Sequence, residues 1–403
     1  MDPIIIVSIV IGLALFFDFT NGFHDTANAM ATPIATGALK PKVAVGIAAA
    51  MNLAGAFLST AVAKAISVDL INKDVNLHVE MVFAGLTGAI LWNLTTWIFG
   101  LPSSSSHALF GGLIGATIVY AGFSAINTAK VFEKVLIPAI CAPLIAGASA
   151  WMATRLAYMI TARDRKDREA LGVGTGRKYF RIGQIFSSSL VALAHGTNDA
   201  QKTMGVITLV LVAAGHQASG DHVQTWVIIA SALAIAVGTY AGGWRIIRTL
   251  GTGLARIKPA QGFSAEVSTG VAILASSHLG FALSTTQVAS GSVVGAGLGK
   301  AGGRIRWTKA RHIIIGWLLT LPAAAIVGAL SASLTKLGNA GLLLDALITV
   351  AVITALFQIS RRNRVTAINV TSEVEDASAI VLSPRQVRAA ARKAAKKKKG
   401  LKS

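Results

Sequence analysis

The chain has 403 residues, of which 53% are hydrophobic and only 13% are charged, with 37 Lys and Arg against 17 Asp and Glu. A soluble globular domain carries about 25% charged residues, so this composition excludes an ordinary soluble domain. Backbone polar groups in lipid must form their hydrogen bonds within the protein, as they do in a helix. The chain has a single cysteine, so it cannot form a disulfide framework. We therefore predict an all-α polytopic membrane protein without a disulfide framework.

Long uncharged runs mark the expected membrane segments. Each run is near or above the roughly 20 residues that a helix needs to cross the hydrocarbon core. The runs are 43–63, 81–122, 135–154, 223–244, 267–299 and 312–335. Clusters of Lys and Arg lie between several of them, and the positive-inside rule places such clusters in the cytoplasm.

The first half of the chain, residues 1–160, is predicted to hold three spanning helices and one hairpin. The first helix runs from the outside to the inside, and a helix over 43–66 returns outward. A hairpin over 81–122 leaves and returns on the outside, and a helix over 131–157 runs inward. The N-terminus is therefore expected outside the cell. The hairpin is either fully spanning or re-entrant, and both give the same orientation.

The second half, residues 182–335, is predicted to repeat this order upside down after a polar cytoplasmic linker over 161–181. Its hairpin over 263–298 starts from the cytoplasmic side, which makes the fold an inverted-topology repeat around a central site. An extra span over 336–360 follows. The basic tail, 361–403, holds 12 of the 37 Lys and Arg residues. We expect it to be cytoplasmic and near the lipid bilayer, with no nucleic acid as partner.

A polar motif occurs twice inside apolar sequence, over residues 21–30 and 195–204. Asp25 and Asp199 match at an offset of 174 residues. The polar residues of each copy recur every three or four positions, so each forms one stripe that faces the bundle interior. A carboxylate in a membrane segment is costly and marks a substrate or ion path. Two of them in matching positions predict a duplicated transporter with one site between its halves.

Each predicted hairpin has a tip rich in hydroxyl groups. Residues 102–106 contain one proline followed by four serines, and residues 284–286 contain one serine and two threonines, at a matching offset of 180. Serine is a favoured N-cap, and a helix N-terminus presents free N–H groups and a positive dipole end. Two such tips that meet at the bilayer midplane predict a site for a small anion.

An anion beside two carboxylates indicates that the anion itself carries a proton. Hydrogen phosphate can donate its proton to Asp25 or Asp199 while it accepts hydrogen bonds from hydroxyls and amides. Sulfate has no proton to donate, and a carboxylate would repel it. A bound cation that bridges the charges is the other arrangement, and it also favours phosphate. A sulfate permease on the same fold is the alternative.

At these motifs the chain resembles the inorganic phosphate transporter (PiT) family, and in particular bacterial low-affinity Pit permeases. The resemblance covers residues 15–360 and includes the segment 251–266 before the second hairpin. It implies an inverted-repeat fold in which motif and hairpin side chains hold phosphate, and it makes a homodimer plausible. The phosphate-binding residues that it implies are Asp25, Asn28, Ser104, Ser105, Asn198, Asp199, Ser284 and Thr285.

The chain departs from the family pattern at positions that bear on coupling. Asn is common in the family at the place of His24, and His at the place of Gln287. Lys202 stands where Asn28 stands in the first half. Its ammonium would compete with a sodium ion, unless it pairs with Asp199 one turn away. Lys202 therefore favours proton coupling, or symport of a neutral metal–phosphate complex, over sodium coupling. The coupling candidates are Lys202, His107, His195, His24 and Gln287.

Together these features predict a secondary transporter that imports inorganic phosphate across the plasma membrane by alternating access. The sequence has no Gly-rich nucleotide-binding loop, so we do not expect ATP to drive the transport. We predict no enzymatic activity, no cofactor and no resident metal. The expected coupling ion is the proton, with sodium as the alternative.

Overall fold

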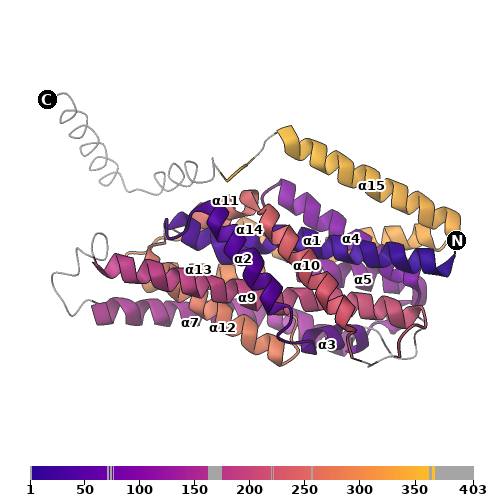
Figure 1. Cartoon of the computed structure of the whole chain (residues 1–403), viewed down its shortest axis with the longest axis horizontal. Coiled ribbons are helices and arrows are strands. Elements are labelled where there is room, and N and C mark those ends of the chain that lie inside the picture. Colours follow the sequence, from indigo (N-terminus) through magenta and orange to yellow (C-terminus); the bar gives the residue numbers. More distant parts are fainter. Residues whose placement is uncertain are drawn as a thin grey trace.

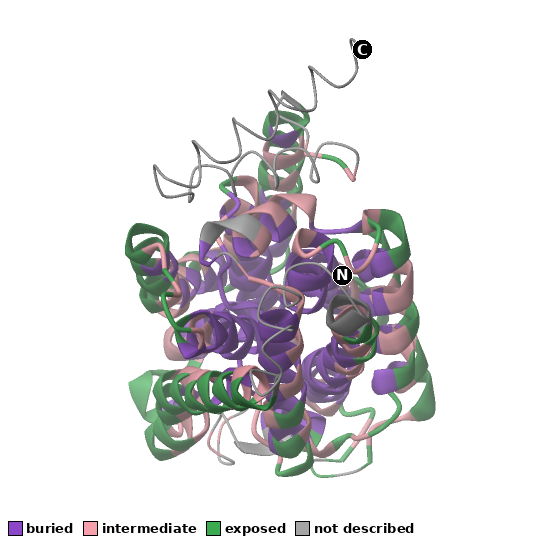
Figure 2. Ribbon diagram, turned by 90° about the vertical axis from the view of Figure 1, so that its left-hand side faces the viewer, coloured by how far each residue is buried: buried purple, intermediate pink, exposed green. Residues whose placement is uncertain are grey.

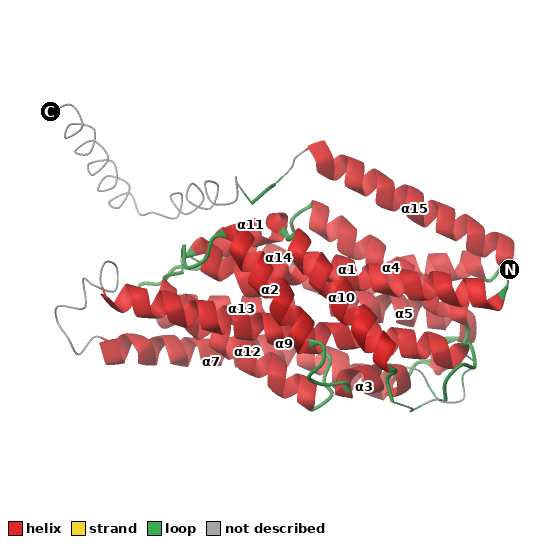
Figure 3. Ribbon diagram, viewed as in Figure 1, coloured by secondary structure: helices red, strands yellow, loops and turns green. Residues whose placement is uncertain are grey.

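The computed structural model of the chain describes residues 2–69, 72, 75, 77–161, 175–218, 220, 222–255, 257–362 and 365–367. In these residues every named element is a helix (Figure 3). The helices pack into an elongated bundle (Figure 1), with buried residues along its middle and exposed residues on its outer helices (Figure 2). The helical fold that the composition predicts is thereby confirmed for the described part of the chain.

The N-terminal half contains a long first helix and a helical hairpin, α4–α5, over the range predicted for one. Its helices are α1 (Pro3–Ala35), α2 (Pro41–Gly55), α3 (Ala61–Asp69), α4 (Val79–Ile98), α5 (Ser105–Ala121), α6 (Thr128–Val131) and α7 (Ile137–Thr161). The single span expected over 43–66 is instead divided between α2 and α3. The chain turns after Gly55, and the hydroxyl of Ser59 accepts a hydrogen bond from the backbone of Ala61, where α3 begins.

The C-terminal half has a second hairpin, α12–α13, again over the predicted range. Its helices are α9 (Thr175–Ala213), α10 (Thr225–Ala241), α11 (Trp244–Gly253), α12 (Pro259–His278), α13 (Thr285–Gly299), α14 (Trp307–Thr335) and α15 (Asn339–Arg362). Of the predicted linker, residues 162–174 lie outside the described residues, and 175–181 already belong to α9. The predicted tail from 368 onward also lies outside the described residues.

Both hairpins turn at a glycine and restart at a serine. Gly100 and Gly280 have φ angles of 63° and 75°, in the left-handed region that favours glycine. The hydroxyls of Ser104 and Ser284 then accept hydrogen bonds from backbone N–H groups of the first turns of α5 and α13. The predicted N-caps are therefore present, and they fix where each hairpin restarts as a helix.

The motif helices approach their neighbours closely because each motif contains a glycine. A Cβ atom added at Gly22 of α1 would lie 2.4 Å from the carbonyl oxygen of Ile235 on α10. One added at Gly196 of α9 would lie 2.2 Å from the carbonyl oxygen of Asn52 on α2. The two glycines match at the offset of 174, so the halves use the same close packing to place their motifs.

The two halves are also entwined through their hairpins. Helix α5 of the first hairpin packs against α14, and α13 of the second hairpin packs against α7. Helices α1 and α9 contact each other directly. Each hairpin is therefore held by a long helix from the opposite half, and both hairpin tips reach the region where α1 and α9 meet.

The outer surface of the bundle is suited to lipid. Within the described residues, five helices are long and apolar enough to cross a membrane, or six if α10 and α11, bent by 67°, form one span. Large apolar side chains on this surface are exposed, among them Leu318, Leu330 and Leu347. Polar side chains lie inside instead, which is the arrangement of an integral membrane protein.

Candidate functional site

The two motif aspartates lie near each other inside the bundle. Asp25 on α1 is 2% exposed and Asp199 on α9 is 0% exposed. Nε2 of His195, one turn before Asp199, is 3.1 Å from Asp199 Oδ2 and 4.0 Å from Asp25 Oδ2. The stripe predicted on α1 is buried from Asp18 to Thr32. We refer to the two aspartates and the polar side chains around them as the polar centre.

The hairpin tips contribute hydroxyl groups to both carboxylates. The hydroxyl of Ser105, the first residue of α5, donates to Asp25 Oδ2 at 2.7 Å. That of Thr285, the first residue of α13, donates to Asp199 Oδ2 at 3.4 Å. Ser105 and Thr285 match at the offset of 180, so equivalent hydroxyls meet equivalent carboxylates. Thr286 adds a hydrogen bond to Asp25 Oδ1 at 3.1 Å.

Ser104 and Ser284 have a different role from their neighbours. Their hydroxyls accept hydrogen bonds from the backbone N–H groups of His107, at 3.2 Å, and Gln287, at 3.4 Å. These two predicted site residues therefore cap their own helices, and among the described residues neither hydroxyl bonds to an aspartate. The caps hold the N-termini of α5 and α13, with their positive dipole ends, beside the polar centre.

The motif asparagines contact the hairpins and leave acceptors free. Asn28 Nδ2 donates to the hydroxyls of Thr285, at 3.3 Å, and Thr286, at 3.0 Å. Asn198 Nδ2 donates to the carbonyl oxygen of Leu283 at 2.9 Å. The side-chain oxygens of Asn28 and Asn198 are buried without a hydrogen-bond partner among the described residues. Because unpaired buried acceptors are costly, these oxygens are suited to a ligand that donates to them.

Lys202 is the buried cation of the polar centre and is 0% exposed. Its Nζ lies 2.5 Å from Asp199 Oδ1, 2.5 Å from the hydroxyl of Ser106 and 3.1 Å from the carbonyl oxygen of Leu283. The pairing with Asp199 that the sequence left open is therefore formed. Through these contacts Lys202 links α9 to the tips of both hairpins.

The histidines and Gln287 fall into two groups. His24 Nδ1 lies 2.8 Å from Asp25 Oδ1, and His195 contacts both aspartates, so these rings belong to the polar centre. Nδ1 of His195 is in turn 3.1 Å from the side-chain oxygen of Asn52 on α2. His107 Nδ1 and Gln287 Nε2 lie 3.5 Å apart and join the two hairpins. Among the described contacts, neither of these two reaches an aspartate.

Several residues of the polar centre were not among the predicted site residues. Thr286 contacts Asp25, and Ser106 contacts Lys202. Ser106 and Thr286 match each other at the offset of 180, and this match could have identified both from the sequence. Asp18 is fully buried, and neither of its carboxyl oxygens has a hydrogen-bond partner among the described residues. Its place on the polar stripe of α1 was the signal available in the sequence.

A further buried carboxylate, that of Glu266, holds the hairpin α12–α13 from its base. Glu266 of α12 accepts hydrogen bonds from Thr32 of α1, at 2.5 Å, and from Gln184 and Ser187 of α9, at 3.0 Å and 2.5 Å. All three donors are neutral, and they come from the helices that carry the motifs. Glu266 therefore ties the second hairpin to both motif helices.

The polar centre also contains atoms that could hold a small cation. One ligand atom each from Asp25, His195 and Asp199 lie within 4.8 Å of one another. Carboxylate oxygens with one imidazole suit a divalent transition metal. The sequence prediction named no resident metal, and this set permits a metal ion that arrives with a substrate.

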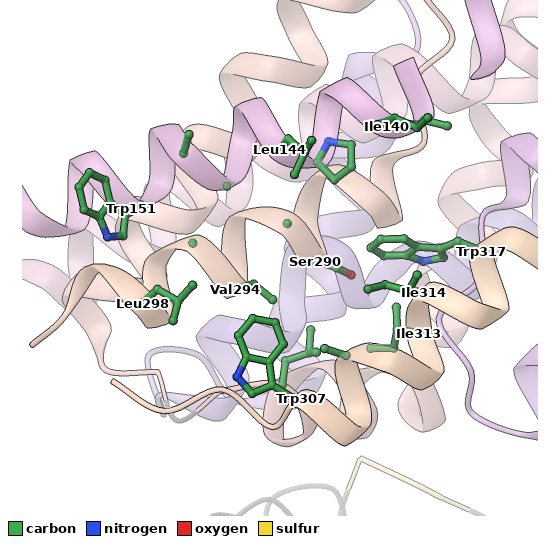
Figure 4. A pocket seen from close by; sticks show the side chains of 18 residues that line it. Ile140, Leu144, Trp151, Ser290, Val294, Leu298, Trp307, Ile313, Ile314 and Trp317 are labelled. Carbon is green, nitrogen blue, oxygen red and sulfur yellow. The ribbon is translucent and has the colours of Figure 1, made fainter. Parts of the chain in front are cut away.

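An apolar groove lies elsewhere, between α7, α13 and α14 (Figure 4). It has a volume of about 500 Å³, and Trp151, Trp307 and Trp317 form part of its wall. Its other lining residues are almost all aliphatic, with Ser290 as an exception. No charged side chain is among the lining residues of this groove, whereas the polar centre contains Lys202 and the hydroxyls of both hairpin tips.

The motifs, hairpins and polar centre can be compared with known proteins. The model of the phosphate transporter family matches residues 21–328, which include both motifs and both hairpins. The chain belongs to this family. Its membership confirms the resemblance on which the sequence prediction drew, and the family is one of transporters rather than enzymes.

Curated relatives and a solved structure agree with this family assignment. The chain is 51% identical over 370 residues to the "Probable low-affinity inorganic phosphate transporter" of Mycobacterium tuberculosis H37Rv. This match covers 91% of this chain and 87% of that protein. It is 41% identical to the protein of the same name from Bacillus subtilis, over 82% of this chain and 98% of that one. The structure titled "The sodium-dependent phosphate transporter" matches with a TM-score of 0.67 and 21% identity, over 82% of this chain and 99% of that one. This last likeness shows a shared fold.

Proposed function

We propose that this member of the phosphate transporter family imports inorganic phosphate across the plasma membrane, and that the anion binds in the polar centre. The names of its relatives support the substrate, since they describe inorganic phosphate transporters. The clusters of Lys and Arg support an orientation with the N-terminus outside and the C-terminus in the cytoplasm. The proposed transport proceeds by alternating access of the polar centre to the two sides.

The pairing of hairpin hydroxyls with motif carboxylates carries this proposal. Ser105 donates to Asp25 and Thr285 donates to Asp199, and each hydroxyl belongs to the first residue of a helix. Hydroxyls and free N–H groups at a helix N-terminus donate to an oxyanion. An ionised carboxylate only accepts, so an oxyanion beside it must bring its own proton. Hydrogen phosphate meets both conditions, and sulfate meets only the first.

Phosphate binding would exchange one set of hydrogen bonds for another. Ser105 and Thr286 now donate to Asp25. With phosphate bound, these hydroxyls would donate to its oxygens, while a P–OH group donates to the carboxylate in their place. In dihydrogen phosphate, a second P–OH group would donate to the free side-chain oxygen of Asn28 or of Asn198. Buried polar groups would then stay paired throughout, which keeps the cost of the exchange small.

Matched contacts support two repeats around this centre. Asn28 of the first motif donates to Thr286 of the second hairpin. Lys202, at the equivalent place in the second motif, donates to Ser106 of the first hairpin. Since Ser106 and Thr286 are themselves equivalent, the two halves exchange the same contact. We propose that they form an inverted-topology repeat and that rocking of one half against the other opens the centre to each side in turn.

We propose the proton as the coupling ion. Lys202 already contacts three oxygens of the kind that a sodium ion would use. Asp18 is buried close to Thr203, Asp199 and Lys202, and among the described residues no donor lies within 3.5 Å of its carboxyl oxygens in hydrogen-bonding geometry. An ionised carboxylate without a partner is costly in a membrane segment, so Asp18 is a suitable place for a proton.

A phosphate that carries a divalent metal is a second candidate substrate, because Asp25, His195 and Asp199 form a possible ligand set. Mn²⁺–phosphate and free phosphate would be compared in the same uptake assay, with and without a chelator. Faster uptake with the metal, lost in His195→Gln, would favour the complex. Equal uptake under both conditions would leave free phosphate as the substrate.

Uptake by the purified chain in proteoliposomes tests the proposed function. Radiolabelled phosphate would be supplied under an inward proton gradient, an inward sodium gradient or neither, with and without excess sulfate. We expect uptake that follows the proton gradient and that sulfate does not inhibit. Uptake driven by sodium would overturn the proton assignment, and inhibition by sulfate would point to the sulfate permease.

Matched aspartate variants connect uptake to the polar centre. Asp25→Asn and Asp199→Asn each keep the size of the side chain. They remove the negative charge that, in the proposal, accepts a hydrogen bond from the P–OH group. Asp345→Asn is the control, because Asp345 is also a buried carboxyl in a membrane helix and bonds to Ser331, far from the motifs in sequence. We expect loss of uptake in the first two and retention in the third. Normal uptake in both motif variants would reject the site.

A further inference from the structure

We propose that the groove between α7, α13 and α14 binds an anionic phospholipid, with an acyl chain in the groove and the headgroup at its basic end. The groove has a volume of about 500 Å³ (Figure 4), and its lining residues Ile140, Leu144 and Ile314 are exposed at the surface of the bundle. Nothing in the phosphate transport described above uses it. Its shape, lining and neighbouring charges each bear on the identity of the occupant.

The lining residues make the body of the groove suitable for a hydrocarbon chain. On α7 they recur at helical spacing from Ala139 to Trp151, and on α13 from Ser290 to Leu298. Figure 4 shows Trp151 and Leu298 at one end and Ile140 and Trp317 at the other. An apolar channel of this kind excludes a soluble anion and offers favourable contacts to CH₂ groups along its length.

Two arginines lie beside tryptophans of the groove wall. Arg155 follows Trp151 by one turn of α7, and its guanidinium lies 5.1 Å from the centre of the Trp151 ring. A second cavity shares Trp307, Ala310 and Ile314 with the groove and is also lined by Arg311 and His312. Arg155 and Arg311 are exposed, and neither forms an ion pair with another described residue. They are therefore available to a phosphate headgroup.

The combination of an apolar groove with two exposed arginines, one beside Trp151 and one in the cavity that shares Trp307, favours one occupant. A neutral lipid would fill the groove but leave both charges unpaired. The basic end is also the end that the positive-inside rule places at the cytoplasmic leaflet, where anionic lipids act on basic residues. An anionic phospholipid satisfies the apolar and the charged part together.

Two contacts connect this lipid site with the hairpin tips. Helix α13 forms one wall of the groove, and its first residues, Thr285 and Thr286, bond to the motif aspartates. Trp317, from another wall, donates through Nε1 to the carbonyl oxygen of Pro102 at the tip of the first hairpin, at 3.1 Å. A lipid in the groove therefore contacts elements that position both tips.

Tryptophan quenching by brominated lipids tests the proposal, because three of the seven tryptophans line the groove. The full chain would be placed in vesicles of phosphatidylcholine with phosphatidylglycerol, with bromine on one lipid or on the other. At equal mole fraction we expect stronger quenching by the anionic lipid. Each arginine should enrich the anionic lipid roughly fivefold at the basic end of the groove. Equal quenching by the two lipids would overturn the proposal.

Variants that remove the arginine charges test whether Arg155 and Arg311 cause the stronger quenching by the anionic lipid. In Arg155→Gln with Arg311→Gln, the excess quenching by phosphatidylglycerol should disappear. The control is Lys40→Gln with Lys42→Gln, which removes two exposed charges on the predicted cytoplasmic side, outside the groove lining. The excess should persist in the control and shrink in Trp307→Phe. If it survives in the arginine variant, the lipid is not held at this basic end and the proposal fails.

Discussion

The hydroxyl of Ser105 lies 2.7 Å from Oδ2 of Asp25, although 80 residues separate them in the chain. Ser105 is the first residue of α5, and both side chains are buried. The contact can form only if the tip of the first hairpin reaches α1 inside the bundle. The position of this tip therefore decides whether Oδ2 of Asp25 keeps this hydrogen bond when the site is empty, while Oδ1 accepts one from Thr286 of the second hairpin.

Ser105→Ala should weaken phosphate uptake without abolishing it. The change removes one hydrogen bond to a charged group, which is worth about 1.5–3 kcal/mol, so we expect KM to rise about 10-fold or more. Initial rates of phosphate uptake into proteoliposomes, over a range of concentrations, would measure this. Ser333→Ala is the control, since that hydroxyl bonds to a backbone carbonyl on the exposed side of α14. An unchanged KM in Ser105→Ala would remove this hydroxyl from the site.

The four serines of the first tip show how far sequence reasoning reaches. The repeat at an offset of 180 selects the tip, and the preference of serine for N-caps indicates that a helix starts there. The sequence does not tell which serine is the cap, because all four are chemically alike. The structure makes Ser104 the cap, so Ser105 and Ser106 are the residues that reach Asp25 and Lys202.

Other contacts of the polar centre had weaker signals in the sequence. Lys202 bonds to the carbonyl oxygen of Leu283, and a backbone acceptor in a hairpin turn has no residue type that would predict it. Asp18 has no counterpart in the second motif, because alanine occupies the equivalent position 192. Repeat matching therefore selects the paired aspartates and overlooks the unpaired one.

Asp18→Asn should separate transport from proton coupling. If Asp18 carries the coupled proton, the amide keeps the shape of the side chain but cannot release a proton. We expect a proton gradient to lose its effect on accumulation, while exchange of internal unlabelled phosphate for external labelled phosphate continues. Both would be measured in the same proteoliposomes. A variant that still accumulates phosphate in response to the gradient would show that the proton binds elsewhere.

Gly22→Ala should destabilise the packing of α1 on α10. The added Cβ would meet the carbonyl oxygen of Ile235 at 2.4 Å, so a backbone has to move, at a cost of about 1–3 kcal/mol. We expect a lower unfolding temperature of the purified protein in detergent, together with reduced uptake. Gly12→Ala in the same helix is the control, because an added Cβ there meets nothing within 4 Å. Equal melting temperatures for the two variants would contradict the close packing.

Lys202→Asn should make phosphate uptake depend on sodium. The variant removes the ammonium from a set of three oxygens, on Asp199, Ser106 and Leu283, and provides the amide found at the equivalent position, Asn28. A sodium ion can then occupy the vacated place. We expect uptake by the variant to be low in choline and to rise about 5-fold or more in sodium, a typical size for coupling between two ligands. Wild-type uptake should be the same in both salts.

One further measurement and a control variant decide whether Lys202 acts through its charge. Sodium should raise the unfolding temperature of purified Lys202→Asn and leave that of the wild type unchanged, since an ion that binds only the folded state stabilises it. Lys130→Asn, which removes an exposed lysine paired with Glu133, should respond to sodium in neither assay. Full uptake by Lys202→Asn in choline would mean that the buried ammonium is dispensable. Loss of uptake in both salts by a well-folded variant would mean that Lys202 provides more than a positive charge beside Asp199.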